Sequence, residues 1–184
     1  MRTFIAVKLP SEVKEKIEKT VDPFRKLGLD ISWVKPKNLH LTLKFLGDVD
    51  EKRIQDVILA LEHALKEREK LTMSLRDFGV FPDFKKPRVI WIGIEKGKED
   101  LIRIQDEIQE ELFKVGFSKE ERGFSPHLTI ARVKSPRGIE KLTGQIKDVN
   151  FESEEIRVEE VILMKSQLHP QGAIYTPIRT FTLK

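Results

Sequence analysis

The chain has 184 residues, of which 39% are hydrophobic and 35% are charged, with a net charge of +4 and an isoelectric point near 9.2. The apolar share is sufficient for a packed interior, which argues against a disordered chain. The absence of cysteine excludes disulfide bonds, thiolate metal sites and a cysteine nucleophile. A typical domain carries roughly 25% charged residues, and such an ionic excess is typical of proteins from hot environments.

Cellular location is suggested by the distribution of apolar residues. The apolar run at 3–7 is too short for a signal peptide and ends at Lys8. No apolar stretch approaches the roughly 18 residues that a membrane span needs. We therefore expect a cytoplasmic protein with no membrane association. Its positive charge fits a polyanionic ligand but does not establish one.

The first half of the chain predicts a strand, a helix, a strand and a second helix. A β-prone run at 3–7 precedes a helix over about 11–27, with Ser11 as the expected N-cap and Pro23 expected to end or kink the helix. After a strand around His40, the second helix extends over about 51–67. Its expected buried positions recur at helical spacing: Ile54, Val57, Ile58, Leu61 and Leu65. Two further strands are predicted over about 71–81 and 88–95.

The second half repeats this pattern at a constant offset. The strand at 90–94 lies 87 residues after the run at 3–7, and a helix follows over about 99–115. Gly28 and Gly116 stand where glycines end helices. A short helix or loop begins at 135–138, and a final strand pair, 157–168 and 173–183, surrounds a turn. We interpret the repeat as a duplication.

The predicted fold class is α+β, with mainly antiparallel sheets and helices on their outer faces. The two copies are expected to form duplicated lobes related by a pseudo-twofold axis, with the active-site cleft between them. No low-complexity linker separates the halves. Residues 1–184 are therefore expected to form one domain made of two interleaved lobes.

A pair of short motifs occupies equivalent places in the two copies. Asn-Leu-His-Leu-Thr-Leu at 38–43 is matched by Ser-Pro-His-Leu-Thr-Ile at 125–130. Because residues two apart share one face of a strand, His40 and Thr42 should face the same way, as should His127 and Thr129. A single His-x-Thr is usually a surface or core feature, but two copies at matching places favour a functional pair.

These side chains suit acid–base chemistry on a phosphate. Imidazoles have a pKa near neutrality, so one His can act as general base while the other acts as general acid. Two hydroxyls can hydrogen-bond the phosphate oxygens between them. No cluster of His, Asp and Glu has metal-ligand spacing, and no glycine-rich phosphate loop is present. We expect no metal, no ATP and no other cofactor.

The paired motifs resemble the H-x-T-x signatures of the two-histidine phosphoesterase superfamily. The longer strings at 33–47 and 124–133 are similar to its branch of RNA 2',3'-cyclic phosphodiesterases, also called the 2'-5' RNA ligase family, and the resemblance covers essentially the whole chain. It implies that His40 is the proton donor, that His127 is the proton acceptor, and that Thr42 and Thr129 contact the phosphate.

The resemblance also implies a substrate and a product. An RNA end carrying a 2',3'-cyclic phosphate would be opened to a 2'-phosphate, and the reverse reaction with a 5'-hydroxyl would form a 2'-5' bond. The expected role is RNA processing, with tRNA fragments as candidate substrates, by a monomer. Which histidine is acid and which is base does not follow from the residues themselves.

Three further residues are candidates for substrate binding. Arg132 suits a phosphate clamp, but strict strand alternation points it away from His127, so a bulge would be required. Phe45 could stack on a base, although a core position is the simpler expectation. Tyr175, the only tyrosine, is expected either at the rim of the cleft or as an ordinary strand aromatic.

Two alternatives stay open at the sequence level. One is an enzyme of the same fold that acts on another cyclic phosphate, such as ADP-ribose cyclic phosphate, or on 2'-5' oligonucleotides. The other is an RNA-binding protein whose His and Thr side chains only hold a phosphate. The two remaining histidines are expected to lie outside the site, His63 on a helix surface and His169 in a turn.

Overall fold

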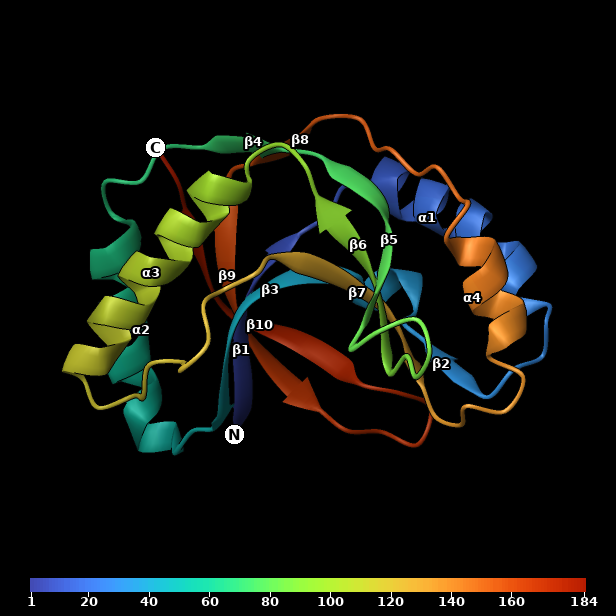
Figure 1. Ribbon diagram of the computed structural model, residues 1–184. Helices are drawn as coiled ribbons and strands as arrows, with labels where there is room; N and C mark the ends of the chain where they lie inside the picture. The colour runs from blue at the N-terminus through green and yellow to red at the C-terminus, as the bar shows by residue number, and fades with distance from the viewer.

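A computed structural model describes all residues from Met1 to Lys184. Two four-stranded antiparallel sheets are packed together, with a helix pair on each side (Figure 1). The helices are α1 (Ser11–Arg25), α2 (Ile54–Leu65), α3 (Lys98–Lys114) and α4 (Glu140–Ile146), and the short 3-10 helices are η1 (Pro36–Asn38) and η2 (Glu51–Arg53). No helix is long and apolar enough to cross a membrane.

The strands divide between the two sheets and a short ribbon. The first sheet has the order β10 (Ile174–Thr182), β9 (Glu160–Gln167), β1 (Arg2–Lys8) and β3 (His40–Asp48). The second has the order β2 (Ile31–Trp33), β7 (His127–Val133), β6 (Val89–Ile94) and β5 (Leu75–Phe81). The ribbon pairs β4 (Leu71–Met73) with β8 (Ile156–Val158). The predicted α+β class is confirmed.

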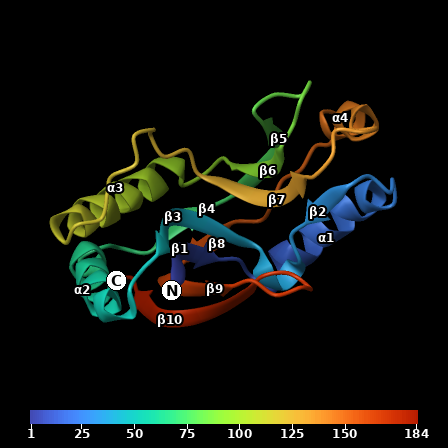
Figure 2. The same cartoon turned by 90° about the horizontal axis from the view of Figure 1, so that it is seen from below.

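Each half of the chain contributes two strands to the sheet of the other half. Strands β2 and β5 of the first half pair with β7 and β6 of the second, while β9 of the second half pairs with β1 of the first and carries β10 beside it. The helices mix in the same way, since α2 packs on α3, and α1 and α4 lie on the same side of the molecule (Figures 1 and 2). Neither half could keep its sheet if the other unfolded.

The helices form where the sequence predicts them, with small differences at the ends. Pro10, not Ser11, is the N-cap of α1, and no side chain caps this end. Pro23 lies in the last turn, and α1 ends two residues later, short of the expected limit at 27. The helix expected over 51–67 is divided into η2 and α2. Gly28 and Gly116 have positive φ, as expected of residues that follow helices.

Two of the predicted strands are each interrupted once. The strand expected over 71–81 breaks at Ser74, and the one over 157–168 breaks at Glu159. At the first break Ser74 exchanges backbone hydrogen bonds with the turn after β6, while the backbone N–H of Leu75 donates to the side chain of Ser153. The short strands before the breaks pair with each other, which explains the separate β4–β8 ribbon.

One close packing contact depends on a glycine of β5. Gly79 lies opposite Trp91 of β6, and a Cβ atom added to Gly79 would stand 2.2–2.7 Å from the indole ring. The indole therefore lies across the glycine, in the space a side chain would fill. Phe81 packs on the same indole with ring centroids 5.0 Å apart. Gly79 thus sets the position of an aromatic pair on the face of the second sheet.

We expect Gly79→Ala to destabilise the fold by about 1–3 kcal/mol, because the added methyl overlaps Trp91 and the packed ring must move. The free energy of unfolding in urea measures this. Gly144→Ala is the matched control: nothing lies within 4 Å of its Cβ position in α4, so stability should rise by roughly 0.5–1 kcal/mol. An equally stable Gly79→Ala variant would contradict the packing argument.

Candidate active site

The two predicted motifs lie on neighbouring strands at the centre of the molecule. His40 begins β3 and His127 begins β7, and these two strands contact each other across the sheets. Figure 2 shows β3 and β7 in the middle of the fold, one on each sheet. The leucines of the first motif and Leu128 and Ile130 of the second are buried on the reverse faces. The predicted alternation of the His-x-Thr motifs is therefore present in both strands.

A cavity of about 610 Å³ lies between the sheets and contains both motifs. All seven residues predicted for the site line this cavity: His40, Thr42, Phe45, His127, Thr129, Arg132 and Tyr175. They come from three strands, β3, β7 and β10. Residues that are far apart in the sequence are thus brought into one space.

Both imidazoles are held in the same way by the backbone. Nδ1 of His40 lies 2.6 Å from the carbonyl oxygen of Asn38, and Nδ1 of His127 lies 2.8 Å from that of Ser125. A carbonyl oxygen can only accept a hydrogen bond, so each Nδ1 carries the proton. In each neutral ring Nε2 is therefore the basic atom, and it points away from the backbone.

The two Nε2 atoms differ in their contacts. Nε2 of His40 is 2.9 Å from Oγ1 of Thr42, whose hydroxyl donates to the neutral ring. Nε2 of His127 has no hydrogen-bond partner within the protein. Burial lowers the pKa of His40, the hydrogen bond to the Asn38 carbonyl opposes this, and the charge of Lys14 lowers the pKa further.

Aromatic rings pack edge-on against both histidines. Tyr175 meets His40 at an interplanar angle of 88° and a centroid distance of 5.2 Å. Phe81 meets His127 at 87° and 5.1 Å. Behind them stand Phe4, 4.8 Å from His40, and Trp91, 6.4 Å from His127. The rings restrict how far each imidazole can rotate.

A matching β-bulge in both strands places Phe45 and Arg132 in the cavity. In the β1–β3 pairing Leu43 is skipped between Thr42 and Lys44, and in the β6–β7 pairing Ile130 is skipped between Thr129 and Ala131. A bulge shifts the alternation by one residue. The bulge that is needed for Arg132 to reach the same cavity as His127 is thus present. The expected core position of Phe45 is wrong, because its side chain is 63% exposed.

Tyr175 lies at the cavity wall, so of its two expected positions the rim of the cleft is the one observed. It packs on Phe4 with centroids 4.9 Å apart as well as on His40. Burial raises the pKa of its phenol, while the nearby charges of Arg132 and Arg2 oppose this rise. Arg132 therefore belongs to the same charge environment as Tyr175, although the two lie on different sheets.

Sequence reasoning missed several residues of the site. Phe4, Trp91, Asn38 and Ser125 were not predicted to support the histidines, although the 87-residue offset relates Phe4 to Trp91 and Asn38 to Ser125. Comparing the equivalent positions could have found them. Phe81 and the loop before β7 have no such signal.

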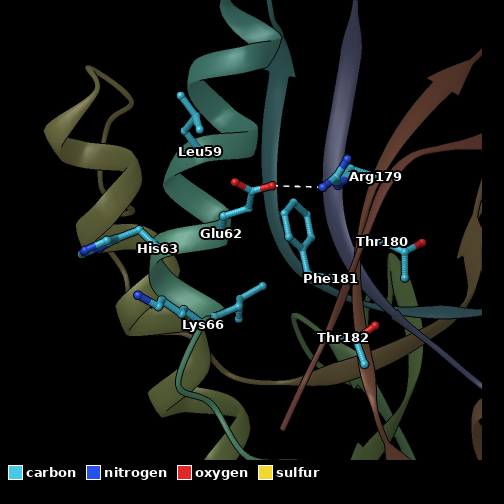
Figure 3. A pocket seen from close by; sticks show the side chains of 9 residues that line it. Leu59, Glu62, His63, Lys66, Arg179, Thr180, Phe181 and Thr182 are labelled. Carbon is cyan, nitrogen blue, oxygen red and sulfur yellow. Dashed lines mark hydrogen bonds and ion pairs between the residues drawn. The ribbon is translucent and has the colours of Figure 1, made fainter.

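The other two histidines lie outside this cavity. His63 is exposed on α2 and pairs with Glu111 at 3.0 Å, and His169 lies exposed in the turn before β10, as predicted. A second hollow of about 510 Å³ between α2 and β10 contains His63 and the Glu62–Arg179 ion pair (Figure 3). It has neither paired histidines nor the matched threonines. No group of three or more His, Asp or Glu side chains could hold a metal ion.

Lys14 provides a test of the electrostatics at His40. We expect Lys14→Gln to raise the pKa of His40, because a positive charge that disfavours the imidazolium is removed. Burial is the larger cause and stays, so the pKa should remain below its usual value. Titration of the imidazole by NMR measures the shift. Lys141→Gln, on α4, is the control and should leave His40 unchanged. An unchanged pKa in Lys14→Gln would contradict the assigned cause.

Comparison with known proteins identifies the family. The sequence profile of the LigT-like phosphoesterases matches residues 7–91 and again 92–175. The RNA 2',3'-cyclic phosphodiesterase of Methanothermobacter thermautotrophicus is 37% identical over 100% of this chain and 99% of its own length. The enzyme of that name from Methanocaldococcus jannaschii is 40% identical, covering 97% and 99%. These sources agree with the thermophilic character expected from composition.

A solved structure supports the same conclusion. A protein of Thermus thermophilus superposes with a TM-score of 0.83 at 30% identity, covering 100% of this chain and 98% of that one. The two successive profile matches cover the two halves of the chain in turn. On these grounds, the chain belongs to the LigT-like phosphoesterase family.

Proposed function

We propose that the protein hydrolyses RNA 2',3'-cyclic phosphate ends to 2'-phosphate ends by general acid–base catalysis. The observation that carries this proposal is the pair of backbone-anchored imidazoles, each directing Nε2 into one cavity that also contains two threonine hydroxyls. Relatives at 37% and 40% identity bear the name of this activity. The protein is proposed to act as one domain over 1–184, with two interleaved lobes.

In the proposed reaction His127 takes a proton from water while the water oxygen forms a bond to phosphorus. The bond between phosphorus and O3' breaks, and His40 donates a proton to O3'. The product carries a 2'-phosphate and a free 3'-hydroxyl. Thr42 and Thr129 donate hydrogen bonds to the phosphate oxygens, and Arg132 balances their charge. If a 5'-hydroxyl takes the place of water, the same displacement of O3' at phosphorus forms a 2'-5' linkage.

The environment of His40 bears on its role as proton donor. Burial lowers the pKa of His40 in the ligand-free protein, so the ring tends to be neutral there. A bound cyclic phosphate carries a negative charge, which favours the imidazolium and raises this pKa. The bound substrate thus favours the protonated form of His40, which is the form that donates a proton to O3'. Oγ1 of Thr42 can then accept a hydrogen bond from the protonated Nε2, while its own hydroxyl proton is donated to the phosphate.

The direct test is turnover of a short RNA that ends in a 2',3'-cyclic phosphate, in the presence of EDTA. We expect a product with a 2'-phosphate and no metal requirement. Adenosine 2',3'-cyclic phosphate, ADP-ribose cyclic phosphate and a 2'-5' dinucleotide are assayed in parallel. Exclusive turnover of one of the last two would favour the alternative enzyme, and tight RNA binding without turnover would favour the RNA-binding protein.

If the two histidines act in one step, removing either should cost nearly as much as removing both. We expect His40→Ala and His127→Ala each to lower kcat by about 10²–10⁴-fold, and the double variant to fall only slightly further. Both single variants should still bind the RNA end. His63→Ala and His169→Ala are the controls and should keep full activity. Additive losses in the double variant would indicate two independent sites.

Cytoplasmic location, a monomeric state and tRNA fragments as substrates stay predictions from the sequence. A monomer fits a site whose two histidines come from one chain. The substrate class proposed for this chain is RNA that ends in a 2',3'-cyclic phosphate, without a choice of a particular RNA.

A further inference from the structure

One buried cation lines the cavity without a place in the reaction described above. Lys44 follows Thr42 by two residues on β3, and its side chain is only 4% exposed. The bulge at Leu43 turns Lys44 away from the Thr42 face, toward α3 and the loop 115–126. The equivalent residue of the second half is Ala131. The duplication therefore does not account for a lysine here.

The ammonium group of Lys44 is incompletely satisfied. Of its three donors, one bonds to Oε1 of Gln109 at 3.2 Å. The nearest carboxylate is that of Glu120, whose Oε1 lies 3.7 Å from Nζ, too far for a hydrogen bond. Burial lowers the pKa of Lys44, and Glu120 opposes this. A buried cation is costly unless it is well paired.

The carboxylate of Glu120 has the opposite charge to the other ionic side chains that line the cavity. The cavity lining includes four cationic side chains, Arg2, Lys44, Arg122 and Arg132, and Glu120 is its only carboxylate. Its backbone N–H is fixed by Gln109 at 2.8 Å, but its side chain is 41% exposed. An anion from solution can therefore reach the position that this carboxylate occupies.

We propose that Lys44, together with Arg122, binds a second phosphate of the RNA, namely the phosphodiester that precedes the terminal nucleotide. In the ligand-free protein the carboxylate of Glu120 stands in for this phosphate and is displaced when RNA binds. The inference rests on the proposed function and refines its substrate class. The preferred substrate is an oligonucleotide, and a nucleoside cyclic phosphate fills only part of the cavity.

The shared cavity fits this assignment. Thr42, which faces the cyclic phosphate, and Lys44 line the same cavity, although the bulge at Leu43 turns their side chains to different faces of β3. One nucleotide of an RNA chain carries a phosphate at each end, so the chain can contact Thr42 with one phosphate and Lys44 with the next. Phe45 lies next to Lys44 with an exposed ring, where a base can stack while its phosphate contacts the lysine.

The test compares substrates that differ in a single charge. One is a dinucleotide that ends in a 2',3'-cyclic phosphate, and the other is the same dinucleotide with a neutral methylphosphonate between its nucleosides. For the unsubstituted protein we expect a lower KM for the charged dinucleotide, and this advantage should shrink as salt rises. Equal KM values for the two dinucleotides would overturn the proposal. Turnover of neither would instead show that the proposed function is wrong.

The variants should act in opposite directions. Lys44→Gln should raise the KM for the charged dinucleotide by roughly tenfold or more, the effect of losing one charge-assisted hydrogen bond, and should raise the KM for the neutral one much less. Glu120→Gln should lower the KM for the charged dinucleotide, because the competing carboxylate is removed. If Lys44 and Glu120 only fix the loop 115–126, Lys44→Gln and Glu120→Gln should raise the KM for both dinucleotides alike. That result would overturn the proposal.

Two controls keep the comparison decisive. Lys44→Met removes the charge but fills the same space with an apolar side chain, so it should fold even if the glutamine variant does not. It should show the same selective increase in KM for the charged dinucleotide. Lys141→Gln removes one positive charge on α4 and should leave both KM values unchanged. An increase in KM of the same size in Lys141→Gln would attribute the effect to overall charge and overturn the proposal.

Discussion

The hydrogen bond from each Nδ1 to the carbonyl oxygen two residues earlier determines what the site can do. It fixes the proton on Nδ1, so that Nε2 of His40 and of His127 becomes the reactive atom. It also orients each ring, because the acceptor belongs to the backbone just before the strand begins. The edge-on aromatic rings add to this constraint. An acid–base pair needs such defined tautomers, and here the local chain supplies them.

The global fold then has to bring two such anchored rings together. Strands β3 and β7 belong to different sheets, and each sheet receives two strands from the other half of the chain. The exchange of β2 and β5 for β9 and β10 ties the sheets to each other. The strands that carry the two histidines are therefore coupled through the main core, a cluster of 41 buried residues to which both β3 and β7 contribute. The cleft is a product of that packing.

The sequence was sufficient for the parts of the structure that repeat or alternate. Amphipathic spacing predicted α3 within one residue at each end, and the period of two placed His40 and Thr42 on one face. The β-bulges could not be predicted, because no glycine or proline marks them, and Phe45 was consequently expected in the core. The breaks at Ser74 and Glu159 depend on pairing between β4 and β8, which are distant in the chain. Long-range pairing of this kind leaves no local signal.

The two halves are alike where the reaction needs two similar groups and different where the substrate is asymmetric. In the proposed reaction one proton is removed from the attacking water and another is donated to O3'. Each half accordingly supplies an imidazole, a hydroxyl and a backbone carbonyl that holds the imidazole. An RNA end, in contrast, has a chain on one side of the phosphate and solvent on the other. Accordingly, Phe45 and Lys44 on β3 are matched by Arg132 and Ala131 on β7. The duplicated His-x-Thr motifs supply the groups of the proposed reaction. The residues that differ after each motif make the two sides of the cleft unlike, so that an RNA chain can bind in one orientation.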